Sequence, residues 1–541
     1  MDYDYIVIGA GTAGCIVASR LTEDPGTSVL LIEAGGWDRS IIVRMPAAVP
    51  LAYQKASYGW GYQSGPEPFV DNKMLDEKRG RLIGGSSSIN AMIFNRGNPM
   101  DFEGWAAQGL AEWDYAHVLP YFRKMESFSG GADDWRGGDG PMKVDRCKAD
   151  HRMFETWLTA GEQAGYPTTP DHNGFQQEGL HRAQTLIGDG ERWTTAQGYL
   201  RAAQGRSNLT IWTRALVHKV LVEGDRAVGV ELTHKGQVRK VTAGKEVILS
   251  AGSFNTPKLM MLSGIGPADH LRAHGIAVKH DVPDVGENLE NHVAASVQYL
   301  AADKDSLAGE FTMMKRAMLG VDWILRRKGM GAISFYQTGG FIRTRPDVPW
   351  PNIQYEFLPF MRGVVNGRLK ATPGFMIYFQ GCRPQNTGRV TLTSADPAAP
   401  PKMIFNHLQY QQDMDDLVDA LKIAREMVAQ PAWDGIRGRE VKPGAEVTTK
   451  ADLEAYIRSD LGTCYHPCGT AKMGVVTDDE GRVKAVRGLR VVDASIMPRV
   501  LTGNISAGVM MLAEKISDRI RGRAALAPSR AEFFHHPHAR V

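Results

Sequence analysis

Three glycines near the N-terminus have the spacing of a turn that binds a dinucleotide. Gly9, Gly11 and Gly14 follow an apolar segment, residues 4–8, and lead into a segment of helical character, residues 15–21. The first glycine of such a motif permits a tight turn, the second lets the backbone approach a pyrophosphate, and the third lets the helix pack on the sheet. Because the free N–H groups of the helix then face the phosphates, these residues predict a strand–turn–helix unit that binds a dinucleotide.

An acidic residue stands at the distance from this turn at which a ribose is recognised. A second apolar run, residues 28–32, ends at Glu33, which is 19 positions after Gly14. A carboxylate at this place accepts a hydrogen bond from a ribose hydroxyl. The glycine pattern alone is weak support, and a purely structural turn is the alternative. The strand before it, the helix after it and the acid together favour a bound dinucleotide.

A second glycine-rich segment could hold an extended polar ligand. Residues 79–92 include Gly84, Gly85, three consecutive serines and Asn90. The segment lacks the Gly-Lys-Ser/Thr ending of a P-loop that hydrolyses nucleotides. Its backbone donors and small side chains suit a ligand that lies along the backbone. A surface turn is the alternative that the same composition allows.

Length and composition limit the classes of protein that this chain can belong to. With 541 residues it is too long for one hydrophobic core, so we expect two or more packed units. The net charge of +3 is small for this length, which argues against a nucleic-acid partner. The sequence has neither a secretory signal nor a run of about 18 apolar residues, and its five cysteines are too few for a disulfide framework. We therefore expect a cytoplasmic protein.

The pattern of turns and apolar residues predicts the elements that position these motifs. Thr256 and Pro257 have the sequence of a helix N-cap and first helical position, so we expect a helix to begin there and to end at Gly264. Further helices are expected over residues 112–126, 153–164, 409–430 and 506–519. Strands are expected as an antiparallel meander over residues 209–212, 215–223, 227–233 and 237–243, and separately over residues 245–249, 351–357, 375–380, 389–394 and 488–492.

These elements predict a mixed α/β (α+β) fold with two domains. The first is a Rossmann-like dinucleotide-binding domain that the chain leaves and re-enters. The second is a discontinuous substrate domain built on an antiparallel sheet of the strands over residues 351–357, 375–380 and 389–394, which could floor a pocket. We expect the first domain to comprise residues 1–160, 195–300 and 460–525, the second to comprise residues 161–194 and 301–459, and an irregular tail to comprise residues 526–541.

Two further segments are interpreted without a catalytic role. Residues 313–328 form a basic amphipathic stretch, for which a helix with one solvated face is favoured over a contact with the inner face of a membrane. The tail contains three histidines, His535, His536 and His538, which indicate a flexible end rather than a metal site.

Four segments taken together match a known family. They are Gly9–Gly14 with Glu33, residues 80–90, residues 252–266, and residues 466–470 with residues 489–504. On these segments the chain resembles the glucose–methanol–choline (GMC) oxidoreductases over nearly its whole length, and among them the bacterial alcohol, choline and sorbose dehydrogenases. The resemblance implies an FAD cofactor that lies extended across the first domain. Because Ile89 stands where some choline-oxidising relatives attach the flavin through a histidine, we expect non-covalent FAD.

The resemblance also implies which residues contact the cofactor. It places Gly84, Gly85 and Asn90 along the flavin and the pyrophosphate, Val217 on the adenine side, and Asp493 near the pyrophosphate and the ribityl chain. A helix that begins near Ser506 would direct its positive end at the N1–C2 carbonyl edge of the flavin and stabilise the charge of the reduced ring. Many relatives have asparagine at the position of Ser506, so this chain departs from the family pattern there.

A catalytic pair is implied in the same way. In the family, an alcohol carbon transfers a hydride to flavin N5 while a base takes the hydroxyl proton, and the matching residues here are His466 as the base and Asn504 as its partner. An imidazole titrates near neutral pH and can accept this proton, whereas an amide holds the substrate oxygen without titrating. An ordinary loop histidine is the alternative. A metal site of Cys464, His466 and Cys468 is not expected, because the spacing is not CxxC and no second ligand pair exists.

The sequence leaves the substrate and the electron acceptor open. A neutral primary alcohol is favoured over choline, because Gln337 occupies the place before Gly339 and Gly340 where an acid for a cation would be sought, although Trp60 and Tyr465 could supply aromatic walls. The branch favours a quinone or an electron carrier as acceptor, and an alcohol oxidase that uses O2 is the alternative. A nicotinamide dehydrogenase, a flavin photoenzyme and a non-enzymatic flavin-binding protein are the other classes considered. The oligomeric state is not indicated.

Overall fold

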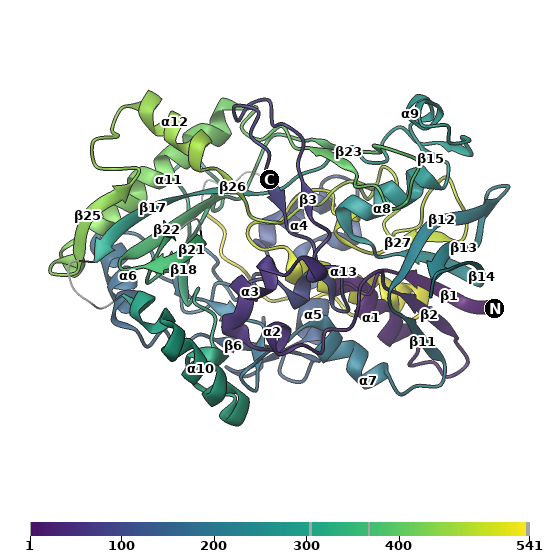
Figure 1. Ribbon diagram of the computed structural model, residues 1–541, viewed down its shortest axis with the longest axis horizontal. Helices are drawn as coiled ribbons and strands as arrows, with labels where there is room; N and C mark the ends of the chain where they lie inside the picture. The colour runs from purple at the N-terminus through teal and green to yellow at the C-terminus, as the bar shows by residue number, and fades with distance from the viewer. Residues whose placement is uncertain (1, 302–305, 366–367, 537–541) are drawn as a thin grey trace.

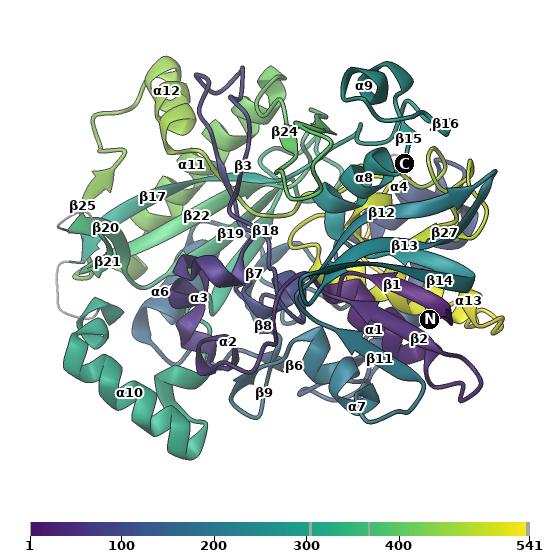
Figure 2. The same cartoon turned by 45° about the vertical axis from the view of Figure 1, so that its right-hand side comes forward.

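The computed structural model describes residues 2–301, 306–365 and 368–536, and two large sheets lie side by side in it (Figures 1 and 2). The first sheet, on the right of Figure 1, has the order β11-β2-β1-β14-β13-β12, with β27 paired to β14. Its strands are β1 (Asp2–Ile8), β2 (Val29–Ile32), β11 (Leu209–Trp212), β12 (Ala215–Glu223), β13 (Arg226–His234), β14 (Gln237–Leu249) and β27 (Leu489–Val491). The prediction of a mixed α/β fold is confirmed.

Strand β14 serves both halves of this sheet. Its first half, residues 237–242, pairs antiparallel with β13, whereas residues 242–249 run parallel to β1. The prediction of two separate strands, residues 237–243 and 245–249, was therefore wrong. The prediction that β11 belongs to the antiparallel meander was also wrong, because β11 runs parallel to β2. Parallel pairing brings the carboxyl ends of β1, β2 and β14 to one edge of the sheet, which is where such sheets bind ligands.

Helices cover the parallel half of the first sheet. Helix α1 (Thr12–Leu21) packs on α13 (Ser506–Ile520), which packs on α5 (Tyr115–Met125). Eight of the ten residues of α1 are buried. The guanidinium of Arg20 donates from Nη2 to Oε1 of Glu514 on α13 at 2.6 Å. This packing joins the two ends of the chain and fixes the position of the glycine turn that precedes α1.

Helix α8 (Gly252–Leu262) begins four residues before its predicted start at Thr256, so that prediction was wrong. Oδ2 of Asp493 accepts hydrogen bonds from the Gly252 N–H at 2.8 Å and from the Thr256 hydroxyl at 2.6 Å. The threonine therefore bonds a side chain from the other end of the chain instead of capping its own helix. Asp493, which follows β27, in turn holds the first turn of α8 against the sheet.

The second sheet is antiparallel and has the order β25-β17-β22-β19-β18-β7, with β26 paired to β17. Its strands are β7 (Gly179–Arg182), β17 (Val293–Ala301), β18 (Thr338–Ile342), β19 (Ile353–Leu358), β22 (Phe375–Gly381), β25 (Arg437–Lys442) and β26 (Gly462–Thr463). Three helices, α6 (Arg152–Gln163), α11 (Gln411–Ala429) and α12 (Lys450–Asp460), contribute residues to the hydrophobic core on one face of this sheet.

The two faces of the second sheet differ in character because successive side chains of a strand point to opposite sides. One face packs under the helices and is apolar, with Ala295, Val297, Tyr299, Tyr355, Phe357, Phe375, Ile377 and Phe379. The other face lines a cavity and is mostly polar, with Ser296, Gln298, Gln354, Glu356, Tyr378 and Gln380 beside the apolar Ala294, Leu358 and Met376. The predicted pocket floor is therefore the second of these faces.

Strand β23 (Arg389–Thr391) does not join that floor, and the prediction that it would was wrong. It pairs with β24 (Lys402–Ile404) in a separate two-stranded sheet. Val390 packs there with Met403 and with Phe254 of α8, which holds this small sheet against the first domain.

The division into domains stays a proposal, which the pairings refine. Strand β17 lies in the second sheet, so we place that boundary near residue 292 instead of residue 300. Strand β26 also pairs with β17, which moves the return to the first domain from residue 460 to about residue 464. Residues 523–536 form no helix or strand, yet Phe533 packs on Tyr115 with ring centroids 5.2 Å apart. Of the three tail histidines, His538 lies outside the described residues.

Helix α10 (Met313–Arg326), at the lower left of Figure 1, is largely exposed. Met314, Met318, Val321 and Leu325 are each more than half exposed, at 73%, 64%, 56% and 75%. Their spacing of four, three and four residues places them on one side of the helix. Among the described residues, none of the helices has both the length and the apolar character needed to cross a bilayer.

Candidate active site

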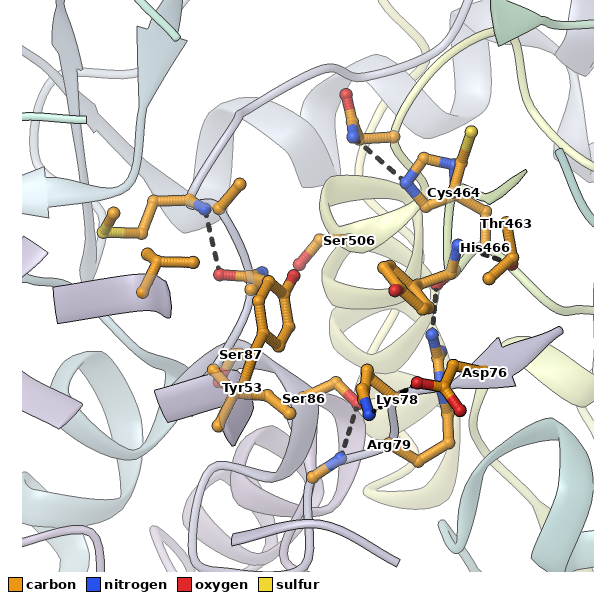
Figure 3. A pocket seen from close by; sticks show the side chains of 18 of the residues that line it. Tyr53, Asp76, Lys78, Arg79, Ser86, Ser87, Thr463, Cys464, His466 and Ser506 are labelled. Atoms are coloured by element: carbon orange, nitrogen blue, oxygen red, sulfur yellow. Dashed lines mark hydrogen bonds and ion pairs between the residues drawn. The ribbon is translucent and has the colours of Figure 1, made fainter. Parts of the chain in front are cut away.

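A cavity of about 2080 Å³ is lined by residues of both sheets. On one side lie the end of β1, the start of α1 and the glycine–serine segment that includes Ser86 and Ser87. On the other side lie the polar face of the second sheet and the loop of Thr463 and His466. Figure 3 labels Ser86 and Ser87 of the first side and Thr463 and His466 of the second, with Ser506 between them in this view.

Two helices begin at the cavity without a side-chain cap. The N-cap of α1 is Gly11, and that of α13 is Ile505. The first N–H groups of a helix lack partners within the helix, and its N-terminus carries a partial positive charge. Ser506, the first residue of α13, lines the cavity, and its buried hydroxyl has no hydrogen-bond partner in the described part of the chain. These helix ends suit a polar or anionic ligand in the cavity.

The glycines let backbone segments approach one another where side chains would not fit. A Cβ at Gly14 would lie 1.9 Å from the carbonyl oxygen of Gly9, and one at Gly85 would lie 2.7 Å from Cα of Gly11. Gly85 also has a φ of +54°, which favours glycine. Gly9, Gly11 and Gly85 line the cavity, whereas Gly14 and Gly84 lie behind its wall. The cradle is therefore made of backbone, as an extended dinucleotide requires.

Glu33 lies at the cavity wall with both carboxylate oxygens partly engaged. Oε2 accepts from the N–H of Ala10 at 3.0 Å, and Oε1 accepts from the N–H of Gly35 at 2.8 Å. Each oxygen keeps acceptor capacity for a ribose hydroxyl. Burial raises the pKa of Glu33 to about 7, and the two backbone N–H groups oppose that shift. The position is the one that the sequence predicted for a ribose contact.

The other predicted cofactor residues lie around the same cavity. Asn90 and Val217 line it, as does Asp493. The carboxylate of Asp493 is already occupied, because Oδ1 accepts from the N–H of Ser495 at 2.8 Å while Oδ2 holds the start of α8. We therefore assign Asp493 a positioning role, in which it fixes the cavity wall. Gly84 has a φ of +84° and donates its N–H to the carbonyl of Ala10 at 2.7 Å, which joins the two glycine segments.

The predicted catalytic residues meet in the cavity although 38 positions separate them in the chain. Nδ2 of Asn504 lies 3.0 Å from Nε2 of His466. Oδ1 of Asn504 accepts from Nδ2 of Asn95 at 2.7 Å and from Nε2 of Gln354 at 3.1 Å. Because its oxygen is held by two donors, the amide presents its N–H group to His466.

A second histidine, His292, determines how His466 is protonated. Its Nε2 lies 3.1 Å from the carbonyl oxygen of Cys382, which can only accept, so His292 carries its proton on Nε2. Its Nδ1 is then an acceptor and lies 3.2 Å from Nε2 of Gln380 and 3.0 Å from Nδ1 of His466. His466 must donate from Nδ1 to complete this contact. The lone pair of the neutral His466 ring is thereby on Nε2, where the Asn504 N–H now contacts it, so a substrate hydroxyl must displace this contact to donate there.

Burial keeps this imidazole uncharged. The pKa of His466 lies well below its usual value because desolvation disfavours the charged ring, and His292 and Arg79 lower it further. Burial also lowers the pKa of His292, to about 4. Both rings are therefore neutral near pH 7, so that His466 can accept a proton there.

The loop that carries His466 is held from both sides. The N–H of His466 donates to Oδ1 of Asn291 at 2.7 Å, and Nδ2 of Asn291 donates to the Thr463 hydroxyl at 2.8 Å. Tyr465 has a φ of +65°, which is uncommon for a residue with a side chain, and its carbonyl accepts from Nη2 of Arg79 at 2.7 Å. Backbone conformations of this kind persist where the surroundings over-determine them.

The sequence did not predict three side chains that the structure brings to this cavity. His292 carries no local motif, and only its distance from His466 reveals its role. Glu356 could have been found from the alternation of β19, since it is the charged residue on the polar face of that strand. Arg362 follows the same strand and also lines the cavity. Of the residues considered for a substrate cation, Trp60 and Tyr465 line the cavity, whereas Gln337 does not and accepts from the N–H of Ala149 at 2.9 Å.

A backbone cradle for a dinucleotide and a neutral base over one cavity define an FAD-dependent oxidoreductase that acts on alcohol (CH–OH) donors. The models of the GMC oxidoreductase family match residues 3–294 and 384–513. The chain belongs to the GMC oxidoreductase family. Its cofactor is FAD, and the buried, apolar Ile89 offers no group for a covalent link. The expectations of family and cofactor are thereby confirmed.

Individual relatives are similar over nearly the whole chain. The "oxygen-dependent choline dehydrogenase" of Chromohalobacter salexigens is 43% identical over 98% of this chain and 97% of its own length, and that of Paraburkholderia xenovorans is 45% identical over 98% and 97%. Among solved structures, pyridoxine 4-oxidase from Mesorbium loti is 29% identical, with a TM-score of 0.86 over 96% of this chain and 100% of that one. A variant of formate oxidase from Aspergillus oryzae RIB40, at 24% identity and a TM-score of 0.89 over 96% and 98%, shares the fold.

Proposed function

We propose that the protein oxidises a primary alcohol to the aldehyde, with His466 as the base. The observation that carries this proposal is the hydrogen-bond chain from the Cys382 carbonyl through His292 to His466, because it puts the proton-accepting lone pair of His466 on Nε2, where a substrate hydroxyl would replace the Asn504 N–H as donor. Asn504 lies beside the same nitrogen and can hold the substrate oxygen. When bound, FAD supplies flavin N5 as the hydride acceptor. His466 removes the hydroxyl proton as the carbon loses its hydride.

The cofactor contacts form part of this proposal. Gly9, Gly11 and the start of α1 would lie against the pyrophosphate, and Glu33 against the ribose. Gly85 and Asn90 would lie along the flavin side, Val217 near the adenine, and the start of α13 at Ser506 near the flavin carbonyl edge. Support comes from their common position on the cavity wall.

Choline is the second candidate substrate. The choline dehydrogenases named above are similar over the whole chain, and the cavity contains Glu356 close to Tyr378 and Tyr336, a carboxylate and aromatic rings of the kind that bind a quaternary ammonium. The guanidinium of Arg362 lies against the same two tyrosines and repels a cation. We therefore rank a primary alcohol without a positive charge first.

An anaerobic titration tests the reaction directly. The visible spectrum of the purified protein should show oxidised flavin, and the band should bleach when a primary alcohol is added without oxygen. Bleaching by choline but by no uncharged or anionic alcohol would favour the second candidate. A flavin spectrum that no alcohol bleaches would contradict alcohol oxidation and favour the inert or photochemical alternatives.

For the electron acceptor we propose a quinone or a protein carrier. O2 is the alternative, which the name of the choline dehydrogenases described above suggests.

We further propose a cytoplasmic location with peripheral contact to the inner face of a membrane through the apolar stripe of α10. The five free cysteines fit a reducing compartment. Leu319 and Arg316 of α10 line the cavity, so a contact on this helix would lie beside the entrance. Sedimentation with anionic vesicles, compared between wild type and Met318→Glu, tests the contact.

A further inference from the structure

The polar face of the second sheet is arranged in rows that lead away from the catalytic pair. Gln354 and Gln380 lie opposite each other on β19 and β22, and Gln354 contacts Asn504. Two residues further along these strands, Glu356 lies opposite Tyr378. A step of two residues along a strand is roughly 6.6 Å. A substrate whose hydroxyl lies at His466 therefore reaches the row of Glu356 and Tyr378 about 7 Å away.

Arg362 is fixed at this second row. At the start of β20 (Met361–Val365), its Nη2 donates to the hydroxyl of Tyr336 at 2.7 Å and its Nη1 donates to the hydroxyl of Tyr378. Its Cζ also lies 5.1 Å from the centroid of the Tyr378 ring. All three residues line the cavity. The two phenols thus orient the guanidinium and leave Nε–H and one N–H of each terminal nitrogen for a ligand.

The charge of this guanidinium has no partner of opposite sign at contact distance. Arg362 forms no ion pair with any carboxylate in the described part of the chain, and both of its hydrogen-bond partners are neutral phenols. The guanidinium is exposed to the water of the cavity, and removing its charge from that water when a ligand enters is costly. Arg316 and Lys370 line the cavity as well and add positive charge. A negative group on the ligand would offset that cost, and a guanidinium binds a carboxylate through two parallel hydrogen bonds.

Glu356 is the acid in this row, opposite Tyr378, and its negative charge is weakened. Burial raises the pKa of Glu356 to about 7, while Arg362 opposes the shift. Its Oε1 has one long contact, 3.3 Å, with Nε2 of Gln354. Near neutral pH the row is therefore positive on balance.

We propose that Arg362, Tyr336 and Tyr378 form a subsite for a carboxylate, so that the preferred substrates are primary alcohols with a carboxylate at the opposite end of the molecule. The inference rests on the proposed function and specifies its substrate class. The row spacing requires hydroxyl and carboxylate to be about 7 Å apart. An aromatic ring with the two groups in para positions meets this requirement, whereas a short 2-hydroxy acid does not.

The test uses three matched substrates and the FAD-loaded enzyme. They are 4-(hydroxymethyl)benzoate, its neutral analogue 4-(hydroxymethyl)benzamide and the cationic 4-(aminomethyl)benzyl alcohol. We expect wild type to favour the benzoate over the benzamide in kcat/KM, and both over the amine. Arg362→Gln should lower kcat/KM for the benzoate by about 10- to 100-fold, the range for a hydrogen bond to a charged group, and leave the benzamide within about three-fold.

Further variants separate the subsite from general effects. Arg362→Lys keeps the positive charge but cannot form two parallel hydrogen bonds with a carboxylate. Compared with Arg362→Gln, it should therefore restore only part of the preference for the benzoate. Tyr336→Phe should lower kcat/KM for the benzoate alone, by about three- to ten-fold, and it keeps the test valid if Arg362→Gln does not fold. Arg272→Gln is the control, because Arg272 is exposed on α9 (Ala268–Ala273) and pairs with Asp269. This variant should leave kcat/KM unchanged for both the benzoate and the benzamide.

Two results with the variants would overturn the inference, and a third with wild type would do so as well. One is an equal loss on benzoate and benzamide in the Arg362 and Tyr336 variants, and the other is a wild-type preference for the amine that Glu356→Gln removes. Oxidation of the benzamide with no preference for the benzoate would refute the subsite and leave alcohol oxidation intact. Failure to oxidise any of the three, together with other alcohols, would count against the proposed function itself.

Discussion

The two sheets of this protein line opposite sides of one cavity with different kinds of chemical group. The first sheet presents backbone groups, namely the turn of Gly9 and Gly11 and the uncapped starts of α1 and α13. The second presents side chains on alternate strand positions, such as Gln354, Glu356 and Tyr378. A backbone cradle tolerates few substitutions, whereas alternate side chains can change without altering the sheet. Cofactor binding is therefore rigidly encoded, and substrate choice is adjustable.

The largest effect should follow from breaking the backbone side. In Gly14→Val, a Cβ would lie 1.9 Å from the carbonyl oxygen of Gly9, and backbone cannot move away as a flexible side chain can. We expect loss of bound FAD and of most soluble protein. The flavin absorbance per protein and the melting temperature measure this. Gly26→Val is the matched control, because a Cβ at Gly26 meets nothing within 4 Å, and it should keep both.

The next largest effect should be on the rate of alcohol oxidation, with FAD binding unchanged. His466→Ala removes the base, so kcat should fall by about 10²–10⁴-fold while FAD stays bound. The measurement is turnover of the best primary alcohol together with the flavin content of the same sample. His274→Ala serves as control, since the contacts of that histidine are with His270, through its carbonyl and its ring, and it does not line the cavity. Unchanged alcohol oxidation in His466→Ala would eliminate the assignment.

A smaller effect should come from the residue that orients the base. In His292→Ala the Nδ1 proton of His466 loses its acceptor, so we expect kcat to fall by about 10- to 100-fold, as for partners that orient an imidazole elsewhere. A purely structural role would not move a pH profile. Because His292 helps to lower the pKa of His466, its removal should shift the acidic limb of kcat/KM to higher pH. An acidic limb that stays in place would argue against this role.

The wild-type pH profile sharpens the same point. The base acts only when neutral, and burial places the pKa of His466 well below its usual value of about 6.5. Activity should therefore stay level as the pH falls from 8 through about 6.5, and it should decline only below that point, where the ring takes up a proton. A titration of kcat/KM measures this. A half-maximal point at or above the ordinary histidine value would contradict a buried, neutral base.

The smallest effect should come from a substitution on the polar face of the second sheet. Glu356 faces Arg362, Tyr378 and Gln354, and burial raises its pKa to about 7, so its carboxylate is charged above that pH. Glu356→Gln removes this negative charge beside the proposed carboxylate subsite. At pH 8 we expect kcat/KM for 4-(hydroxymethyl)benzoate to rise by about two- to five-fold, with no gain at pH 6, where the wild-type group is protonated. The benzamide should show no gain at either pH.

The helix after β14 shows where local sequence signals mislead. Thr256 and Pro257 have the pattern of a helix start, but α8 begins at Gly252. A proline inside a helix leaves one carbonyl without its usual N–H donor. Here the carbonyl of Ser253 accepts the hydroxyl of Thr470 instead, at 2.7 Å, from a segment more than two hundred residues away. No local pattern contains that partner, so the helix boundary could not be predicted.

Some residues of the candidate site could be predicted from the sequence, and others could not. His466 and Asn504 were predicted from motifs, and their side chains meet in the structure. His292 was not predicted, because its role depends on a contact across 174 positions of the chain. Val217, Glu33 and Asp493 occupy the cavity wall, but the carboxylate of Asp493 accepts hydrogen bonds from Ser495 and from the distant start of α8.

The sequence by itself determined the dinucleotide turn and the family, because both depend on residue types at fixed spacing within short motifs. Through the family resemblance it also predicted His466 and Asn504 as the catalytic pair. Gly9, Gly11 and Gly14 act through backbone geometry that neighbouring residues set. Only the tertiary structure decided the protonation of His466 and the charge of the substrate pocket. Both depend on which distant groups share a water-poor cavity, where one hydrogen-bond acceptor or one unpaired guanidinium changes the energy of a proton or a ligand far more than it does in water.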